Sequence, residues 1–152
     1  KCRNCKSLKL SNLFSLGRMS FTGKFPRDRR TNIKKTELGL VICSNCSLVQ
    51  LNRNYNLKYL YNPDYGYRTG INKTMTNHMK NIKKMLSRKS KLISGDHVLD
   101  IASNDATLLN FYNKNIVKVG IDPLVNKYIK YYKKIDYKIS DFFSSSKILK
   151  KK

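Results

Sequence analysis

The four cysteines of the chain form two Cys-x-x-Cys pairs, Cys2/Cys5 and Cys43/Cys46, and this spacing constrains the fold more than any other feature. A Cys-x-x-Cys turn points two sulfurs at one ion, and Zn²⁺ prefers four tetrahedral ligands, so two such turns complete one site. No cysteine is left over. We therefore predict that the four thiolates bind a single structural zinc ion with no open coordination position.

Two other chemistries also use paired cysteines. A thioredoxin-like redox pair needs a cysteine of low pKa that opens a helix after a strand, and neither pair is followed by a clear helical pattern. Structural disulfides are typical of secreted proteins, and the sequence shows no signal peptide, so we favour zinc over both. Lys6 and Ser47, rather than glycine, follow the second cysteine of each pair. This departure predicts a slightly strained turn at each pair.

The net charge of +23 comes from 32 Lys and Arg against 9 Asp and Glu, which is unusual for a soluble enzyme. Such a balance suggests nucleic acid or an anionic surface as a partner. Drift in a low-GC genome is the other explanation, because Lys, Asn, Ile and Tyr all have A/T-rich codons. The scatter of basic residues along the chain favours drift, whereas one cluster favours an anion-binding patch. That cluster contains Arg27, Arg29, Arg30, Lys34 and Lys35.

Length and hydropathy limit the architecture further. The 152 residues suffice for one ordinary domain or two small ones, and a segment of about fifty residues stabilises itself poorly by hydrophobic burial alone. A metal would explain how such a segment folds. No apolar run approaches the roughly 20 residues that span a bilayer, so we expect a soluble, cytoplasmic protein with no membrane partner.

The sequence pattern predicts an α/β protein with two domains. Residues 1–51 contain loops and short strands around the metal, ending in a short strand at 48–51, and residues 52–70 form a polar, aromatic connection. From Ile71 an amphipathic helix of about five turns runs to a point before Ser94. Strands and helices then alternate, which predicts a doubly wound parallel sheet over 71–152. The expected elements are strands at His97–Ile101, Val117–Ile121 and 135–139, and helices at 107–112 and 124–133.

The turns after the first two of these strands are the candidate ligand site, because ligands of such sheets bind beyond the carboxyl ends of the strands. Asp122 ends the second strand, where an acidic side chain can accept hydrogen bonds from both ribose hydroxyls of an adenosine ligand. A simple strand-terminating turn is the alternative role for Asp122. Ala102, Asn104 and Ala106 occupy the usual glycine positions of the first loop. The predicted cofactor-binding residues are Asp100, Ala102, Ser103, Asn104, Asp105 and Asp122.

The combined pattern resembles the S-adenosylmethionine-dependent sugar C-methyltransferases that carry an N-terminal zinc-binding domain. The matching segments are Cys-Arg-Asn-Cys (2–5), Cys-Ser-Asn-Cys-Ser-Leu-Val-Gln-Leu (43–51), Tyr-Gly-Tyr-Arg-Thr-Gly (65–70, leading to His78), Val-Leu-Asp-Ile-Ala-Ser-Asn-Asp-Ala-Thr-Leu-Leu (98–109) and Gly-Ile-Asp-Pro (120–123). The resemblance implies a Rossmann-like class I methyltransferase sheet, S-adenosylmethionine as cofactor and a nucleotide-linked keto-deoxysugar as substrate. The family usually has glycine where Ala102 and Ala106 stand, and the extra methyl groups could crowd the cofactor.

In that family a base removes the proton beside a sugar ketone, and the enolate carbon then attacks the sulfonium methyl. Tyr67 and His78 are the candidate catalytic residues here, and Tyr65 and Arg68 could help to close the site. Packing on the apolar side of the helix is the alternative role for His78. The resemblance implies that the family's base lies in a later half of the domain. We therefore expect this chain to correspond to the zinc domain plus the first part of the cofactor domain, and to be inactive alone.

The rival interpretation is a nonenzymatic, basic zinc-ribbon protein that binds nucleic acid. Positive charge would supply affinity through counterion release, and tyrosines could stack on bases. Steeply salt-dependent binding would support this function. Binding of an adenosyl ligand that is lost in Asp122→Ala would support the methyltransferase.

Overall fold

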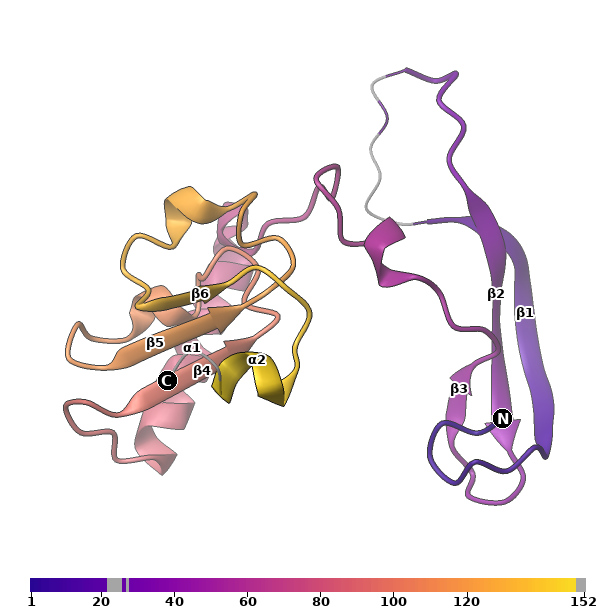
Figure 1. Ribbon diagram of the computed structural model, residues 1–152, viewed down its shortest axis with the longest axis horizontal. Coiled ribbons are helices and arrows are strands. Elements are labelled where there is room, and N and C mark those ends of the chain that lie inside the picture. The colour runs from indigo at the N-terminus through magenta and orange to yellow at the C-terminus, as the bar shows by residue number, and fades with distance from the viewer. Residues whose placement is uncertain (22–25, 27, 150–152) are drawn as a thin grey trace. The chain divides into compact units, whose positions relative to one another are not determined.

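The computed structural model describes residues 1–21, 26 and 28–149, and over these residues the protein is a mixed α/β structure (Figure 1). The chain divides into two compact units, Lys1–Gly66 and Tyr67–Lys152. Each unit has its own sheet. Among the described residues, no helix combines the length and the apolar character that crossing a bilayer requires.

The first unit is built on an antiparallel sheet in the order β1-β2-β3. Its strands are β1 (Leu10–Ser20), β2 (Lys35–Cys43) and β3 (Val49–Leu51). The last strand is confirmed, whereas β1 and β2 are longer than the short strands that we predicted. Alternate residues of β2 are buried, ending in Val41 and Cys43, as expected of a strand with one covered face. The buried face of β2 therefore leads directly into the second cysteine pair.

The pairing of β1 with β2 is irregular near its middle. The register shifts between Asn12 and Phe14 and again between Ser15 and Arg18. Gly17 lies in the second shift with φ +68°, a conformation that glycine adopts without steric cost. Farther along the chain, the predicted connecting segment contacts this same unit. Tyr55 donates a hydrogen bond to the carbonyl of Glu37 on β2.

The second unit contains a parallel sheet in the order β4-β5-β6. The strands are β4 (His97–Ile101), β5 (Val117–Ile121) and β6 (Tyr137–Ile139), so the first two match their predicted bounds and the third starts two residues late. The predicted amphipathic helix is also present as α1 (Lys73–Lys89). Asn72 caps it by accepting hydrogen bonds from the N–H groups of Thr74 and Met75 at 2.8 and 3.2 Å.

The two helices predicted between the strands are wrong. Residues 107–112 and 124–133 form turns with short 3₁₀ segments, η3 (Leu109–Phe111) and η4 (Ile129–Tyr131). Both stretches are shorter than the roughly 12 residues that an isolated helix needs, so local propensity does not hold them helical. Instead, turns place their apolar side chains in the core. The described residues thus contain one three-stranded parallel sheet, and a complete Rossmann-like sheet is not evident.

The core of the second unit lies on this sheet and under the connecting turns. Val119, Ile121 and Ile139 form a buried cluster, and Ile148 of α2 (Ser145–Leu149) packs against it. The connecting turns add further buried side chains: Leu109, Tyr112, Ile116, Leu124, Val125, Tyr128, Tyr132 and Ile135. No residue of α1 is buried. The carboxyl ends of the strands are therefore fixed by buried turns rather than by helices.

Candidate metal centre and ligand loop

Each cysteine pair lies in the same kind of tight turn. In the first turn, the N–H of Cys2 bonds to the carbonyl five residues later at 2.7 Å, and the N–H of Lys6 bonds back to the Cys2 carbonyl at 3.1 Å. Cys43 and Ser47 repeat both bonds at 3.0 and 2.8 Å. Lys6 and Ser47 have φ values of +65° and +59°. The predicted strain is thus confirmed, because residues with a Cβ adopt this left-handed conformation at a cost.

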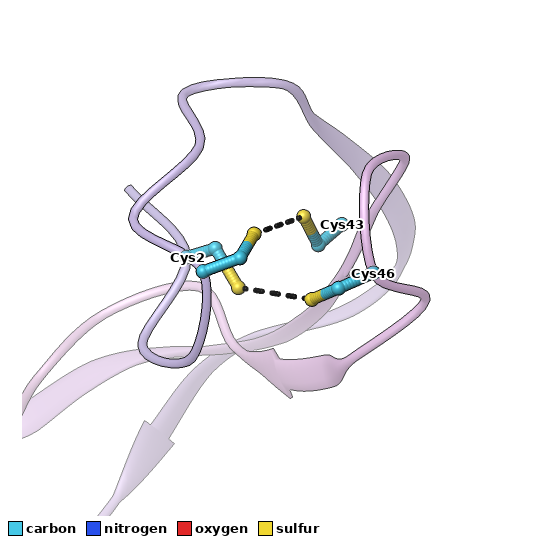
Figure 2. A group of neighbouring side chains, drawn as sticks. Cys2, Cys43 and Cys46 are labelled. Carbon is cyan, nitrogen blue, oxygen red and sulfur yellow. Dashed lines mark hydrogen bonds between the residues drawn. The ribbon is translucent and has the colours of Figure 1, made fainter.

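The two turns bring the four thiols together (Figure 2). All four Sγ atoms lie within 4.8 Å of one another, and the Cys2–Cys46 and Cys5–Cys43 sulfurs are 3.6 Å apart. A disulfide requires about 2.05 Å, so these are free thiols. Zinc–sulfur bonds of about 2.3 Å in a tetrahedron place neighbouring sulfurs about 3.8 Å apart. The observed spacing and the all-thiol donor set therefore fit Zn²⁺.

Hydrogen bonds and burial shift the pKa values of these thiols in different directions. Hydrogen bonding by the Asn45 side chain, helped by the backbone of Ser7, lowers the pKa of Cys5 to about 6. For Cys2 burial acts in the opposite direction, but backbone N–H groups, chiefly that of Cys5, leave the pKa lowered. Burial raises the pKa of Cys43. Thiolates are the form that binds metal, and donors aimed at the sulfurs help to stabilise that form.

Arg3, inside the first turn, connects that turn to β3 and to the residues that follow β3. Its N–H donates to Oε1 of the buried Gln50 at 2.8 Å. Its guanidinium Nη2 donates to the carbonyl of Arg53 at 3.1 Å and to Oδ1 of Asn54 at 2.8 Å. These contacts join segments about fifty residues apart in sequence. They hold the first cysteine turn against β3 and the residues that follow it.

In the second unit, the loop after β4 adopts an alternating backbone. Ala102, Asn104 and Ala106 have φ values of +62°, +47° and +59°. These are the positions that sequence analysis assigned to the glycines of a nucleotide-binding loop. The loop therefore has glycine-like geometry without glycine, at the carboxyl end of β4. Most N–H groups of the loop are already paired within the protein: those of Ala102 and Ser103 with the carbonyl of Ile121, and that of Asn104 with Asp122.

Two aspartates flank this loop. Asp122, which is buried, accepts a hydrogen bond from the N–H of Asn104 at 3.0 Å through Oδ2, and one from Leu124 at 2.7 Å through Oδ1. It thus holds the two strand-end turns together. Asp100 lies at the end of β4, where burial and the nearby Asp122 raise its pKa to about 6. The remaining lone pairs of both carboxylates are suited to accepting hydroxyl hydrogen bonds.

Asp105 and Asn104 bind the segment that precedes α1. Asp105 is 1% exposed, and its Oδ2 accepts hydrogen bonds from Arg68 Nη1 and from the N–H of Gly70, both at 2.9 Å. Asn104 Oδ1 accepts from the N–H of Thr69 at 2.9 Å. Arg68 was a candidate for closing the site, but sequence analysis missed its buried partner. Nothing in the spacing of two residues 37 apart indicates such a pair.

Tyr132 is a supporting residue that sequence analysis missed altogether. Its side chain is fully buried, and its hydroxyl donates to the carbonyl of Asn104 at 2.8 Å. The Ser103 hydroxyl lies 2.8 Å from the Tyr132 hydroxyl oxygen. Because the Tyr132 proton is already donated to Asn104, Ser103 donates to Tyr132. Tyr132 therefore holds the predicted cofactor loop through its hydrogen bonds with Ser103 and Asn104. The only sequence signal is a tyrosine in the stretch that was predicted to be a helix.

The two candidate catalytic residues have different surroundings. The carbonyl of Tyr67 accepts hydrogen bonds from the Tyr128 hydroxyl at 2.7 Å and from Asn104 Nδ2 at 3.4 Å, so Tyr67 lies beside the predicted cofactor loop. Its side chain is largely exposed. His78 is exposed on α1, which argues against the packing role considered for it. A catalytic role for either residue stays a prediction.

Comparison with known families supports the first of these two sites. The family model Methyltransf_13, described as "Putative zinc binding domain", matches residues 2–61, a stretch that includes all four cysteines. The comparison with curated proteins finds no match. Residues 2–61 therefore correspond to a methyltransferase-associated zinc-binding domain in which four cysteines are clustered.

Proposed function

We propose that this chain is the zinc-binding and cofactor-binding part of an S-adenosylmethionine-dependent C-methyltransferase that acts on a nucleotide-linked keto-deoxysugar. The observation that carries the proposal is the match of residues 2–61 to a methyltransferase-associated zinc-binding domain with four clustered cysteines. The second support is that a parallel α/β unit follows in the same chain. The sugar specificity comes from the sequence resemblance alone.

In this proposal Cys2, Cys5, Cys43 and Cys46 hold zinc as a structural ion. Four thiolates fill a tetrahedral shell, so no position is left for substrate or water. The sheet of the first unit buries little, since every residue of β1 after Leu10 is exposed. The metal would therefore replace the hydrophobic core that so small a unit lacks.

The second unit would bind the adenosyl ligand at the loop after β4. Three arguments support this: the order β4-β5-β6 is that of one half of a doubly wound sheet, the loop has glycine-like φ values, and acidic side chains end both strands. In this arrangement Asp122 would accept hydrogen bonds from the ribose hydroxyls while it holds Asn104. S-adenosylmethionine would supply an electrophilic methyl group. We assign no base, and Tyr67 and His78 remain the candidates.

Calorimetric titration with S-adenosylmethionine and S-adenosylhomocysteine tests the proposal. The parent chain should bind both ligands, and Asp122→Asn should weaken binding at least tenfold, since each lost charge-assisted hydrogen bond costs about 1.5–3 kcal/mol. Asp136→Asn is the matched control. Asp136 accepts a hydrogen bond from the backbone N–H of Lys118 at 2.8 Å, but it precedes β6 and so lies at the amino ends of the strands, opposite the predicted ligand site. Its replacement should therefore leave the affinity unchanged. Absence of binding to the folded parent chain would refute the proposal.

Nucleic-acid binding is the second candidate function. The observation that favours it is a basic groove in the first unit, away from any residue assigned above to zinc or cofactor. It is compatible with the methyltransferase proposal and does not depend on it.

A further inference from the structure

The β1–β2 hairpin carries three adjacent open hollows at the end far from the cysteines. Their volumes are about 420, 430 and 680 Å³. Lys35 lines all three, and Arg18 lines two of them, so the hollows are neighbours, and together we call them the basic groove. The basic residues that line it are Arg18, Arg29, Arg30, Lys34, Lys35 and Arg53.

The positive charge of the basic groove is poorly compensated within the unit. Glu37 is the one acidic residue among the described lining residues, and Arg53 Nε already pairs with it at 3.2 Å. Asp28, close by in sequence, adds a second negative charge, and its Oδ1 accepts a hydrogen bond from the N–H of Arg30. Six cations therefore face two carboxylates. Of the basic cluster predicted from sequence, Arg27 lies outside the described residues, and the other four members all line the groove. The strand pairing adds Arg18, which lies opposite Glu37, to this cluster.

An exposed aromatic ring lies beside these charges. Tyr59 is 43% exposed, and its ring centre lies 4.2 Å from Nζ of Lys34, which lines the groove. The ring of Phe21 stacks on Tyr59 with 5.8 Å between the ring centres. The surface therefore offers charges for phosphates and an aromatic ring for a base.

We propose that the basic groove binds single-stranded nucleic acid. An open surface lined by six cations suits a ligand with phosphates repeated along its length, whereas one nucleotide would occupy only a part of it. Single strands expose their base faces, which can stack on Tyr59 beside Lys34. A duplex hides those faces and would leave the Tyr59 ring in water. The charges and the exposed aromatic ring together therefore favour a single strand.

Fluorescence anisotropy with a labelled oligothymidine strand tests this in the full, zinc-loaded chain. Five phosphate contacts, from the lining cations other than Arg53, predict a slope of about −3.5 for log K against log salt concentration, and Arg18→Gln with Lys35→Gln should reduce the size of that slope by about 1.4. At moderate salt the double variant should bind roughly tenfold more weakly or worse. Tyr59→Ala should bind about fivefold more weakly or worse, because a stacking contact is lost.

The matched control is Lys80→Gln with Lys84→Gln, which removes the same charge from exposed positions of α1. Melting temperature and bound zinc, measured on every variant, separate a local effect from unfolding. Equal weakening by the groove variant and the control would overturn the proposal, because bulk charge would then explain the binding. A duplex of the same length that binds as tightly as the single strand would also overturn it.

Discussion

Arg68 and Asp105 form a buried ion pair in the second unit, with Nη1 and Oδ2 2.9 Å apart. The Arg68 side chain is 21% exposed and that of Asp105 is 1% exposed. The same carboxylate also accepts hydrogen bonds from the N–H groups of Gly70 and Thr107. Gly70 is required at this contact, because a Cβ there would lie 2.7 Å from Oδ2. The pair therefore holds the segment before α1 against the predicted cofactor loop.

We expect Arg68→Met to destabilise the second unit by about 2–4 kcal/mol. The variant leaves a buried carboxylate without its cation, and breaking one side of a buried pair typically costs about 3–5 kcal/mol. The hydrogen bonds that remain from the backbone offset part of this cost. Urea unfolding followed by circular dichroism measures the free energy. Hydrogen exchange of residues 102–107 shows whether the effect is local.

Lys147→Met is the matched control for Arg68→Met. Lys147 pairs with Asp141, and both side chains are more than 40% exposed, so the loss should stay below about 1 kcal/mol. Equal losses in the two variants would mean that burial adds nothing to the Arg68–Asp105 pair.

The elements predicted correctly from the sequence are those with a clear apolar periodicity or apolar run of their own. The alternating or continuous apolar residues of β4 and β5 and the helical spacing of α1 specify those elements locally, and all three form where they were expected. Residues 107–112 and 124–133 differ. The pairs Leu109/Tyr112 and Leu124/Tyr128 are spaced as in a helix, but turns and short 3₁₀ segments bury them. There tertiary packing, which the sequence pattern does not contain, outweighs propensity.

The candidate sites also combine features that a local pattern predicts with features that depend on the whole fold. The spacing of the cysteines predicts a cluster because each pair lies within one tight turn, and the four sulfurs do meet. The support of the loop after β4 is non-local: Tyr132 and Arg68 reach it from 28 and 37 residues away. Such partners follow from the completed fold, so no local pattern could have indicated them.

The metal centre makes a direct prediction about its ligands. We expect Cys43→Ser to lower metal affinity by more than roughly a hundredfold, since changes outside the ligand shell alone cost about 10- to 100-fold. The first unit should then unfold or be strongly destabilised, because metal binding supplies folding free energy. Metal analysis and the visible spectrum of the Co²⁺-substituted chain report the loss of thiolate ligands. Ser44→Ala, at an exposed neighbour, should retain both metal and fold. Unchanged metal content and folding in Cys43→Ser would refute the zinc assignment.

Glycine should relieve the strain in the two cysteine turns. We expect Lys6→Gly and Ser47→Gly each to stabilise the first unit by about 1 kcal/mol or slightly less, because the left-handed conformation costs other residues about 1–2 kcal/mol while glycine loses more entropy on folding. Thermal unfolding of the zinc-loaded chain measures the change. Gly17→Ala supplies the converse, since Gly17 has φ +68° and open space around its Cβ position, so only backbone strain should be added. A stabilising Gly17→Ala would contradict the argument.

Ala106→Gly tests the predicted cofactor loop. Ala106 is fully buried with φ +59°, and its methyl group stands where the resembling family usually has glycine. We expect the variant to bind S-adenosylmethionine at least as tightly as the parent chain, because backbone strain falls and space is gained. Calorimetry measures this affinity, with Ala102→Gly expected to act in the same direction. A clear loss of affinity in Ala106→Gly would show that the loop is not used as proposed.

The raised pKa of Asp100 makes the stability of the second unit depend on pH. Burial and Asp122 raise this pKa from 3.8 to about 6, so the folded state binds a proton more tightly than the unfolded chain. The contribution of Asp100 is therefore most favourable below about pH 4 and is lost as the pH rises from about 4 to 6. The full shift corresponds to at most about 3 kcal/mol, at 1.36 kcal/mol for each pKa unit.

Asp100→Asn should remove this dependence, because the amide does not titrate. At about pH 7.5 we expect the variant to be more stable than the parent by about 1–3 kcal/mol, and at about pH 4 the two should be nearly equal. Hydrogen exchange of β4 and β5 at each pH measures the difference within the second unit, so that proton-linked loss of zinc from the cysteines does not enter the comparison. Asp136→Asn, at the amino ends of the strands, controls for the loss of a negative charge. A stability gain in Asp100→Asn that is the same at both pH values would contradict this argument. It would show that burial and repulsion do not act on the ionised carboxylate, and that Asp100 and Asp122 are electrostatically independent.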